Sequence, residues 1–333
     1  MKNIAINGFG RIGRAFLRSV LLDEQAKQKL NIAAINIGPG DPSLTALLFK
    51  YDSVFREYNG TVEYKDNYLN INGYKIKILT ELDPLKIDWG KLNIDVVVDA
   101  TGKFCKKSDA LKHIKAGAKK VLITAPAIDE DITIIPGVND NEYNAKTHNI
   151  ISLGSCTTNC FAPIVKVLKE NFTIINGLMT TIHSYTNDQV LLDIEHKDPR
   201  RARAAGLNII PTKTGADKVI IKIYPELTGK IKAQAIRVPT PNVSLVDFTF
   251  VTKEELNSQK INNLFKEYSE NKLKNILQYC QEPLVSSDFI QNSHSCIIDS
   301  LLTESVGNLS KVFGWYDNEF GYSCRLKDFL LHI

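Results

Sequence analysis

The chain has 333 residues, of which 44% are hydrophobic and 23% charged, and its formal net charge is +4. These values are typical of an ordinary globular protein of about two domains. The mild charge gives no support for binding to nucleic acid or to a membrane surface. No apolar run approaches the roughly 18 residues that a membrane span requires. Because a strand pattern begins at Lys2, we also expect no secretory signal segment.

The cysteines do not indicate a disulfide framework. Six cysteines in a chain of this length fit a reducing cytosol better than a secreted scaffold. Cys156 and Cys160 could share one face of a helix, but no second Cys or His pair accompanies them at the spacing of metal ligands. We therefore expect no metal site.

A dinucleotide-binding pattern opens the chain. Residues 3–7 form a strand pattern, Gly8-Phe9-Gly10-Arg11-Ile12-Gly13 follows at once, and helical spacing runs from Arg11 to Leu22. The glycines allow a tight turn and close approach of the backbone to a pyrophosphate, which the helix N-terminus attracts. This context predicts a domain that binds NAD(P) or FAD. The alternative is a glycine-rich turn in a doubly wound domain that binds no phosphate.

The acidic residue that normally follows the second strand is missing. That strand is predicted at Asn31–Asn36, and an acid is expected roughly 20 residues after the last glycine to bind the ribose 2′-hydroxyl. The chain has Asn36-Ile37-Gly38-Pro39-Gly40 instead, and its first acid is Asp41. An apolar residue at this place removes the repulsion that would exclude a 2′-phosphate. Selectivity for NAD is therefore expected to be weakened.

The rest of the first half alternates strands and helices, after a small antiparallel excursion. Ligands in open α/β sheets bind beyond the carboxyl ends of strands, which is where Thr101 and Gly102 fall. A helix over Ser108–Ala116 is predicted to have Ser108 as its N-cap. The predicted strands are Thr61–Tyr64, Tyr68–Asn70, Tyr74–Leu79, Ile94–Asp99, Lys120–Ile123 and Asn149–Ser152.

A cysteine lies at the next strand-to-helix junction. Gly154 supplies a turn, and a helical pattern runs over Cys156–Lys169. The partial positive charge of the helix N-terminus predicts a lowered pKa for the Cys156 thiol, which would make it a nucleophile. A buried structural cysteine is the competing interpretation, and this stretch on its own slightly favours it.

The second half is rich in long strands that are not separated by regular helices. Together with the first half it predicts an α/β chain: a Rossmann-type doubly wound domain over 1–153, and an α+β catalytic domain over 154–317 with a largely antiparallel sheet. A final helix over 318–333 is expected to pack back on the first domain. The predicted strands are Phe172–Thr186, Ile231–Val238, Val243–Thr252 and Lys311–Tyr316, and the covering helices are Lys213–Tyr224 and Glu254–Tyr268.

Several long motifs in the right order give a family resemblance. The whole chain resembles glyceraldehyde-3-phosphate dehydrogenase, the phosphorylating enzyme of glycolysis. The matching segments are Asn7–Arg14, Ser155–Cys160, His183–Gln189, Arg200–Ala205, Arg237–Ser244 and Trp315–Glu319. Ordered motifs spread over the chain are far more specific than any single one of them.

The resemblance implies a role for each matched residue. Cys156 is the implied nucleophile and His183 its base, whereas Cys160 is not the nucleophile. Thr186 and Arg237 match the site of the substrate phosphate; Ser155, Thr157, Thr214 and Gly215, with Arg201 nearby, match that of the attacking phosphate. Asn318 matches the residue that binds the nicotinamide amide. The implied cofactor lining is Gly8, Gly10, Arg11, Ile12, Gly13, Asn36, Ile37, Thr101, Gly102 and Thr124.

Without the resemblance, plainer interpretations of these residues stand. His183 would be an ordinary strand histidine, Arg237 a member of a surface ion pair, and Thr214-Gly215 a helix N-cap region. The segment Asp193–Gly206 is a charge run, and such runs are usually solvated.

Two departures from the family pattern concern the adenosine end of the cofactor. NAD-specific members carry Asp where this chain has Ile37, and a Leu-Pro pair where it has Ile194-Glu195. In the family the latter loop crosses to the cofactor of a neighbouring subunit. Glu195 would repel a 2′-phosphate there, or replace the lost ribose contact. We expect NAD as the working cofactor, with NADP possible.

The resemblance further implies the substrates and the assembly. It predicts oxidation of glyceraldehyde 3-phosphate with inorganic phosphate to 1,3-bisphosphoglycerate, by a homotetramer. The cysteines predict a cytoplasmic location, and the charge and the apolar runs predict binding to neither nucleic acid nor membrane. The enzyme alternatives are the erythrose-4-phosphate dehydrogenase relative, which lacks the threonine found here at Thr186, and an NADP-preferring gluconeogenic variant. A protein that uses the dinucleotide cleft to bind RNA is a further alternative, without support from charge or aromatic pattern.

Overall fold

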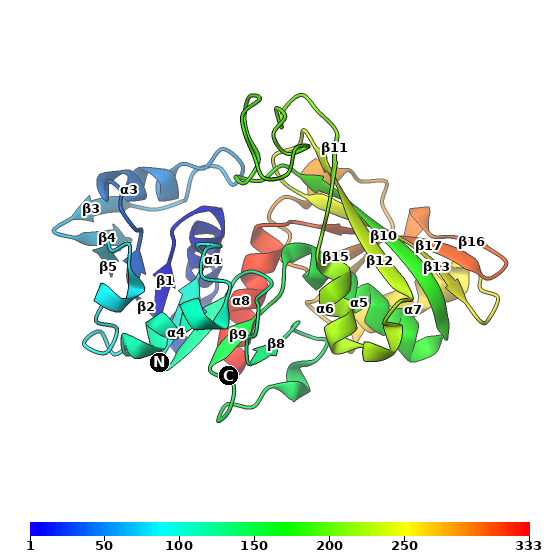
Figure 1. Cartoon of the computed structure of the whole chain (residues 1–333), viewed down its shortest axis with the longest axis horizontal. Helices are drawn as coiled ribbons and strands as arrows, with labels where there is room; N and C mark the ends of the chain where they lie inside the picture. Colours follow the sequence, from blue (N-terminus) through cyan, green and yellow to red (C-terminus); the bar gives the residue numbers. More distant parts are fainter. The chain divides into compact units, whose positions relative to one another are not determined.

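A computed structural model describes residues 1–333, which form two compact units. The first unit contains Met1–Ile134, Asp140–Gly154 and Ser323–Ile333, and the second contains Ile135–Asn139 and Ser155–Tyr322. Each unit is built on one large sheet with helices packed against it (Figure 1). None of the helices is long and apolar enough to cross a membrane.

The first unit has a nine-stranded sheet in the order β3-β4-β5-β2-β1-β6-β7-β9-β8. All neighbours from β5 to β8 are parallel, and only β3-β4-β5 is antiparallel. This is the doubly wound arrangement that was predicted. Its strands are β1 (Lys2–Asn7), β2 (Leu30–Asn36), β3 (Val62–Lys65), β4 (Tyr68–Ile71), β5 (Tyr74–Leu79), β6 (Val96–Asp99), β7 (Lys120–Ile123), β8 (Ile132–Thr133) and β9 (Ile150–Ser152).

Helices cover the parallel strands, whose side chains are buried on both faces, as in Val96–Val98. Lys2 Nζ donates to the Leu330 carbonyl over 3.0 Å and Lys327 pairs with Asp23, so the C-terminal part of α8 is fastened within this unit. The helices are α1 (Arg11–Leu21), α2 (Glu24–Lys29), α3 (Ser43–Lys50), α4 (Lys107–Lys115), the 3₁₀ turns η1 (Pro84–Lys86) and η2 (Asp140–Glu142), and α8 (Phe320–His332) from Ser323 onwards.

Two glycines of the first motif are required by close packing. Gly8 has φ +94°, and a Cβ there would lie 2.8 Å from the Thr101 backbone nitrogen. A Cβ on Gly13 would lie 2.3 Å from the Gly8 carbonyl oxygen, so only glycine lets α1 leave β1 this tightly.

The second unit has an eight-stranded sheet in the order β11-β12-β10-β13-β17-β15-β14, with β16 paired to β17. Most pairs are antiparallel; β10 with β12 and β14 with β15 are parallel. The fold class expected from the sequence is therefore confirmed. The strands are β10 (Ile174–Ser184), β11 (Ile210–Thr212), β12 (Ile231–Val238), β13 (Ser244–Thr252), β14 (Leu277–Cys280), β15 (Cys296–Asp299), β16 (Glu304–Val306) and β17 (Leu309–Tyr316).

One helix, α5, forms the centre of this unit's hydrophobic core. Its buried side chains pack on the middle strands, and the Phe161 ring meets Phe248 of β13 edge-on at 4.9 Å between centroids. Burial of such aromatic and aliphatic side chains is the main stabilising contribution to a sheet of this kind. The helices are α5 (Cys156–Asn171), α6 (Ala216–Ile223), α7 (Ser258–Glu270), and the 3₁₀ turns η3 (Pro225–Leu227), η4 (Ser286–Phe289) and η5 (Ser300–Leu302).

The structure corrects several expected boundaries. The prediction that Ser108 caps α4 is wrong, because the helix begins at Lys107 and the N-cap is Lys106, without a side-chain cap. The helix expected from Glu254 begins at Ser258, where the Asn257 side chain accepts from the Lys260 backbone over 2.8 Å. Short elements such as α2, α3, β8, β11 and β14–β16 were not predicted, because too few residues show their periodicity.

Candidate active site

The start of α5 is held by its own N-cap. Gly154 has φ +64°, which confirms the predicted turn, and the Ser155 hydroxyl accepts from the Thr158 backbone nitrogen over 3.1 Å. Cys156 is then the first residue of the helix and is half-buried. Ser155, predicted to bind phosphate, thus also defines where the helix begins.

A histidine from the central strand β10 faces this cysteine. The Cys156 Sγ and His183 Nε2 atoms lie 3.5 Å apart, and His183 Nδ1 lies 2.7 Å from the Ser184 carbonyl oxygen. A carbonyl only accepts hydrogen bonds, so Nδ1 carries the ring proton and Nε2 presents its lone pair to the thiol. The imidazole is therefore held in the tautomer that a general base requires.

Burial sets the protonation of both members of this pair. Burial, reinforced by the charge of Arg237, lowers the pKa of His183 to about 3. Burial also raises the pKa of the Cys156 thiol, against the opposing effects of Arg237 and of hydrogen bonds with Thr157. The expectation of a lowered thiol pKa was wrong, because loss of solvation outweighs the helix N-terminus here. The resting pair is a thiol beside a neutral imidazole.

Tyr316, which was not predicted as a site residue, packs against this pair and forms hydrogen bonds beside it. The Tyr316 hydroxyl lies 2.9 Å from Thr157 Oγ1 and 2.7 Å from Thr181 Oγ1, and its ring meets the His183 ring edge-on. Burial raises the pKa of Tyr316 well above its usual value, so it stays a neutral hydrogen-bonding group. Its place at the end of an alternating strand, two residues before Asn318, was the available signal.

Two arginines lie beside the base, on the side of Ser184. Arg237 of β12 pairs in register with His183, and its Nη1 donates to Thr186 Oγ1 over 2.7 Å and to the Ser184 carbonyl over 3.1 Å. Its Nε is buried without a partner. Arg201 donates through Nε to Thr212 Oγ1 over 3.0 Å.

The Asp188 carboxylate joins these cationic groups. One of its oxygens accepts from the Thr186 hydroxyl and the other from Arg201. Burial raises the pKa of Asp188, but the hydrogen bond from Thr186 and the charge of Arg201 lower it more, so the pKa lies below its usual value. The carboxylate thus makes the contacts that the oxygens of a bound anion would make, which marks an anion-binding site.

The remaining predicted phosphate ligands are joined to this network less directly. Arg201 Nη2 donates to the Lys213 carbonyl over 3.4 Å, next to Thr214. The Thr214 hydroxyl accepts from the Ala216 backbone over 3.3 Å, and Gly215 precedes α6 without a side-chain cap. Direct contacts thus join Cys156 to His183 and Arg237 to Thr186, and Asp188 connects Thr186 to Arg201. Arg201 contacts Lys213, the residue before Thr214-Gly215.

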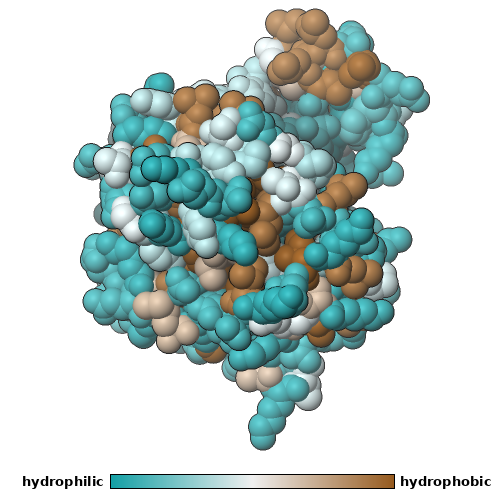
Figure 2. All heavy atoms as spheres, turned by 90° about the vertical axis from the view of Figure 1, so that its left-hand side faces the viewer, coloured by the Kyte–Doolittle hydropathy of each residue, from teal (hydrophilic) through white to brown (hydrophobic).

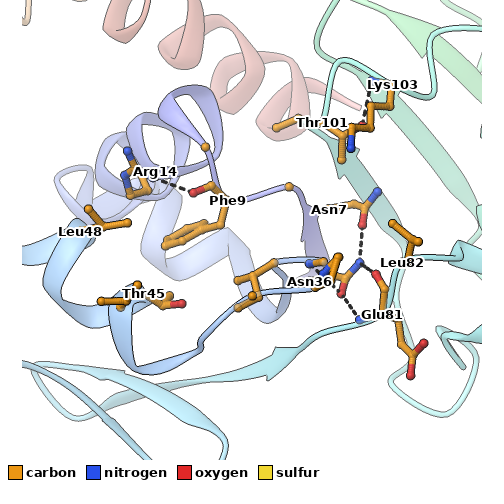
Figure 3. Close-up of a pocket in the computed structure, with 18 of the residues that line it drawn as sticks. Asn7, Phe9, Arg14, Asn36, Thr45, Leu48, Glu81, Leu82, Thr101 and Lys103 are labelled. Carbon is orange, nitrogen blue, oxygen red and sulfur yellow. Dashed lines mark hydrogen bonds between the residues drawn. The ribbon is translucent and has the colours of Figure 1, made fainter. Parts of the chain in front are cut away.

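The first unit carries a separate cavity of about 500 Å³ at the dinucleotide motif (Figure 3). It is lined by predicted cofactor residues Gly8, Gly10, Asn36, Ile37 and Thr101, and also by Phe9, Arg14, Asp41, Glu81 and Lys103, which were not predicted. The predicted Arg11, Ile12, Gly13, Gly102 and Thr124 are not in the lining. Arg11 is committed elsewhere, because its guanidinium lies 2.5 Å from the Asp52 carboxylate.

The cavity fits a dinucleotide pyrophosphate. Gly10 is the N-cap of α1 and has no side chain that could cover the positive end of this helix. A Cβ on Gly10 would meet nothing within 4 Å, which leaves room for an anion at the positive end of the helix.

Known proteins of one family are similar to this chain over nearly its whole length. The model of the glyceraldehyde 3-phosphate dehydrogenase NAD-binding domain matches residues 2–107, and that of the C-terminal domain matches residues 155–318. The chain is 51% identical over 331 residues to glyceraldehyde-3-phosphate dehydrogenase of Priestia megaterium, covering 99% of this chain and 97% of that protein. The chain belongs to the glyceraldehyde-3-phosphate dehydrogenase family. The resemblance inferred from the motifs is confirmed.

Other relatives show the same extent of match. Glyceraldehyde-3-phosphate dehydrogenase 1 of Bacillus subtilis is 49% identical, and the Geobacillus stearothermophilus enzyme of the same family is 48% identical. Each alignment covers 99% of this chain and 97% of the relative.

In this member of the glyceraldehyde-3-phosphate dehydrogenase family, the side-chain amide of Asn36, which lines the cavity, is occupied by hydrogen bonds within the protein. Asn36 Nδ2 donates to Asn7 Oδ1 over 2.7 Å and to the Glu81 carbonyl over 2.9 Å, and its Oδ1 accepts from the Glu81 backbone over 2.9 Å (Figure 3). Asn36 therefore shapes the rim of the cavity with its side chain. Ile37 offers no polar atom in its side chain, and the acids in the lining are Asp41 and Glu81.

Proposed function

We propose that this chain catalyses the phosphorylating oxidation of D-glyceraldehyde 3-phosphate to 1,3-bisphosphoglycerate, with NAD as the hydride acceptor. The observation that carries the proposal is the contact of Cys156 Sγ with the unprotonated Nε2 of His183, beside the cationic site of Arg237. A nucleophile, a base and an anion site are the groups that this reaction needs.

The Cys156–His183 pair accounts for the oxidation. The sulfur attacks the aldehyde carbon while the thiol proton passes through His183 Nε2 to the carbonyl oxygen, which gives a hemithioacetal. His183 Nε2 then takes the proton of the new hydroxyl as hydride leaves the same carbon, and a thioester remains. NAD, when bound, supplies the acceptor for this hydride. An oxygen of inorganic phosphate next attacks the thioester carbon, the C–S bond breaks, and the sulfur regains its proton from His183.

The anion site accounts for the choice of substrate. Thr186 and Arg237 are proposed to bind the phosphate of the substrate, and Arg201 with Ser155, Thr157, Thr214 and Gly215 to bind the attacking phosphate. Hydroxyls, backbone N–H groups and guanidinium forks are strong ligands for phosphate oxygens. In this scheme the substrate phosphate replaces Asp188 as the partner of Thr186, and the attacking phosphate replaces it as the partner of Arg201.

Arg237→Lys tests the substrate-phosphate site. Lysine keeps the charge but loses the guanidinium fork, so we expect KM for glyceraldehyde 3-phosphate to rise roughly 10- to 100-fold, the effect of one or two charged hydrogen bonds. Turnover of unphosphorylated glyceraldehyde should change much less. The measurement is kcat/KM for both aldehydes. Arg203→Lys is the matched control, because Arg203 makes an exposed ion pair with Asp193. An equal loss for both aldehydes in Arg237→Lys would contradict the assignment.

The reaction itself is tested by its requirement for phosphate. NADH formation should depend on glyceraldehyde 3-phosphate and on inorganic phosphate together, and erythrose 4-phosphate should be a poor substrate. Thr186 supports the glyceraldehyde 3-phosphate reaction over the erythrose-4-phosphate dehydrogenase alternative, because its hydroxyl accepts a hydrogen bond from Arg237 in the proposed anion site. Faster turnover of erythrose 4-phosphate, without need for phosphate, would reject the proposal in favour of that relative.

For the cofactor we propose NAD with weakened discrimination against NADP. Ile37 in the cavity lining supports weakened discrimination, whereas the carboxylates of Asp41 and Glu81 in the same lining favour NAD through repulsion of a 2′-phosphate. The test is the ratio of kcat/KM for NAD to that for NADP. Ile37→Asp should raise this ratio by about tenfold or more, because it adds a carboxylate at the ribose. A strong preference of the unaltered chain for NADP would overturn the proposal.

A cytoplasmic homotetramer is proposed from the surface and the cysteines. The loop between β10 and β11 exposes five large apolar side chains, and Figure 2 shows hydrophobic residues gathered at the top of its view. Such a patch is typical of a subunit interface. The six free cysteines suit a reducing compartment. Sedimentation equilibrium should give four times the chain mass of 37.3 kDa, and a monomer mass would reject it. The exposed side chains are Leu191, Leu192, Ile194, Leu207 and Ile209.

A further inference from the structure

The first unit has a second cavity, of about 210 Å³, at the edge of the sheet opposite the dinucleotide motif. Strand β2 runs from one cavity to the other: Leu30 at its amino end lines the second cavity, and Asn36 at its carboxyl end lines the first. Its seven residues span roughly 20 Å at the usual rise of a strand. The second cavity is therefore a separate site.

The walls of this cavity are mostly apolar. Val20, Leu30 and Ile71 are at most 2% exposed, and the rings of Tyr58 and Tyr74 also line the space. An apolar cavity of roughly 150 Å³ is already large enough for a benzene ring. Aromatic rings pack favourably on one another in offset or edge-on arrangements. The volume and the walls therefore suit one six-membered aromatic ring.

The two tyrosines differ in the state of their hydroxyls. The Tyr74 hydroxyl donates to Asn31 Oδ1 over 2.9 Å and lies 3.1 Å from the Ile32 carbonyl oxygen. The Tyr58 hydroxyl makes no hydrogen bond within the protein, although the residue is only 8% exposed. The Tyr58 ring is held in place by the Phe49 ring, with 5.0 Å between the centroids. Tyr58 thus carries a free hydrogen-bond donor on a fixed ring in the cavity wall.

Positive charge surrounds this hydroxyl. The buried Arg18 guanidinium lies 5.8 Å from the centroid of the Tyr58 ring, and it donates to two backbone carbonyls instead of pairing with a carboxylate. Burial raises the pKa of Tyr58, and the charges of Lys27 and Arg18 oppose this effect. Lys27 lines the cavity and pairs only with Glu24, in an exposed contact of the kind that contributes little. These cations attract an anion to the unpartnered hydroxyl.

We propose that this cavity binds a small aromatic carboxylate, whose ring fills the apolar space and whose carboxylate accepts hydrogen bonds from the Tyr58 hydroxyl and the Lys27 ammonium. The site is additional to those of the proposed function and does not depend on it. The apolar walls disfavour inorganic phosphate, which would lose its hydration there, and the two cations favour a carboxylate over a neutral ring of the same size.

The test uses 4-fluorobenzoate as the probe, observed by fluorine NMR, with NAD present at saturation. We expect a dissociation constant of about 0.1–1 mM, which is reasonable for a ligand of about ten heavy atoms. The neutral 4-fluorobenzyl alcohol has the same ring and should bind about threefold to tenfold more weakly, because it lacks the charge.

Four conservative variants identify the groups that bind the probe. Tyr58→Phe keeps the ring and should weaken 4-fluorobenzoate binding about threefold to tenfold, the value of one hydrogen bond. Tyr74→Phe is its matched control and should leave the affinity unchanged, because that hydroxyl already donates within the protein. Lys27→Met should weaken binding of the acid about twofold to fivefold and leave binding of the alcohol unchanged. Lys29→Met, on the same helix but outside the cavity lining, should change neither affinity.

A fifth variant fills the cavity. Leu21 lines it and is partly exposed, so Leu21→Trp should abolish binding of both probes while NAD binding is retained. The proposal would be overturned by the absence of saturable 4-fluorobenzoate binding, by equal affinities for the acid and the alcohol, or by equal losses in Tyr58→Phe and Tyr74→Phe. Binding that occurs only without NAD would place the probe in the dinucleotide cavity and would equally reject the site.

Discussion

Cys156→Ser is expected to lower kcat for aldehyde oxidation by about 10⁴-fold or more, the scale on which loss of a covalent nucleophile acts. A serine hydroxyl is a far poorer nucleophile near neutral pH, and His183 Nε2 alone cannot compensate. The resting thiol is neutral, so its attack relies on proton transfer to His183 within 3.5 Å. Single-turnover formation of NADH measures the loss. Near-normal turnover would show that the sulfur is not the nucleophile.

Cys160→Ala is the matched control for this variant. Cys160 lies one turn further along α5, is fully buried, and has its Sγ 3.5 Å from the Gly314 carbonyl. Burial raises the pKa of this thiol well above its usual value, and the neighbouring Cys296 adds to the effect. The control should keep its turnover with some loss of stability.

Without phosphate, the wild-type chain should carry the acyl group on Cys156, and an acyl group found on Cys160 would contradict the assignment.

His183→Asn should slow hydride transfer by roughly 10²- to 10⁴-fold, the usual contribution of a positioned base. Asparagine retains a polar group near the thiol, but it cannot accept the proton of the hemithioacetal hydroxyl. A primary deuterium isotope effect should appear with substrate deuterated at the aldehyde carbon, because hydride transfer then limits turnover. An unchanged rate of the hydride step would show that another group is the base.

The same variant has a consequence for stability against pH. The folded-state pKa of His183, about 3, lies below its ordinary value of 6.5, so the unfolded chain binds this proton first as pH falls. The contribution of the neutral His183 imidazole to the free energy of unfolding is complete above pH 6.5 and is lost as pH falls towards 3. From pH 7 to pH 5 the wild type should lose about 2 kcal/mol of unfolding free energy relative to His183→Asn. Urea unfolding of both proteins at the two pH values measures this, and parallel losses would contradict a buried neutral imidazole.

Much of the fold could be predicted because its long elements carry strong periodicity. The strand Lys120–Ile123 and the helix that begins at Cys156 start at the residues predicted, because apolar spacing and, for the helix, the Gly154 turn mark them. Elements such as α2 and β8 could not be found, because a segment of two to six residues has too little pattern. Whether such a short segment forms a helix or a strand is determined by the residues that pack or pair with it, which are distant in the sequence.

The candidate site was only partly predictable for a different reason. Sequence could name Cys156 and His183, but their 3.5 Å contact depends on how α5 packs on β10. The sign of the thiol pKa depended on burial, which no local motif reveals. For Tyr316 the only signal in the sequence was its place two residues before Asn318, because its hydrogen bonds with Thr157 and Thr181 depend on where β17 lies relative to α5 and β10.

The Asp188 carboxylate gives the anion site a resident counterion. Thr186 and Arg201 already donate hydrogen bonds to the Asp188 carboxylate. The binding free energy of an arriving anion is therefore only the difference between its interaction with these two residues and that of Asp188. A singly charged anion gains almost nothing, because Asp188 carries the same charge. A phosphate dianion has a second charge and a third oxygen, and the unpartnered Arg237 Nε is available to donate to that oxygen. We therefore expect this candidate site to favour anions of higher charge, so that chloride or a small carboxylate competes only weakly with the substrate.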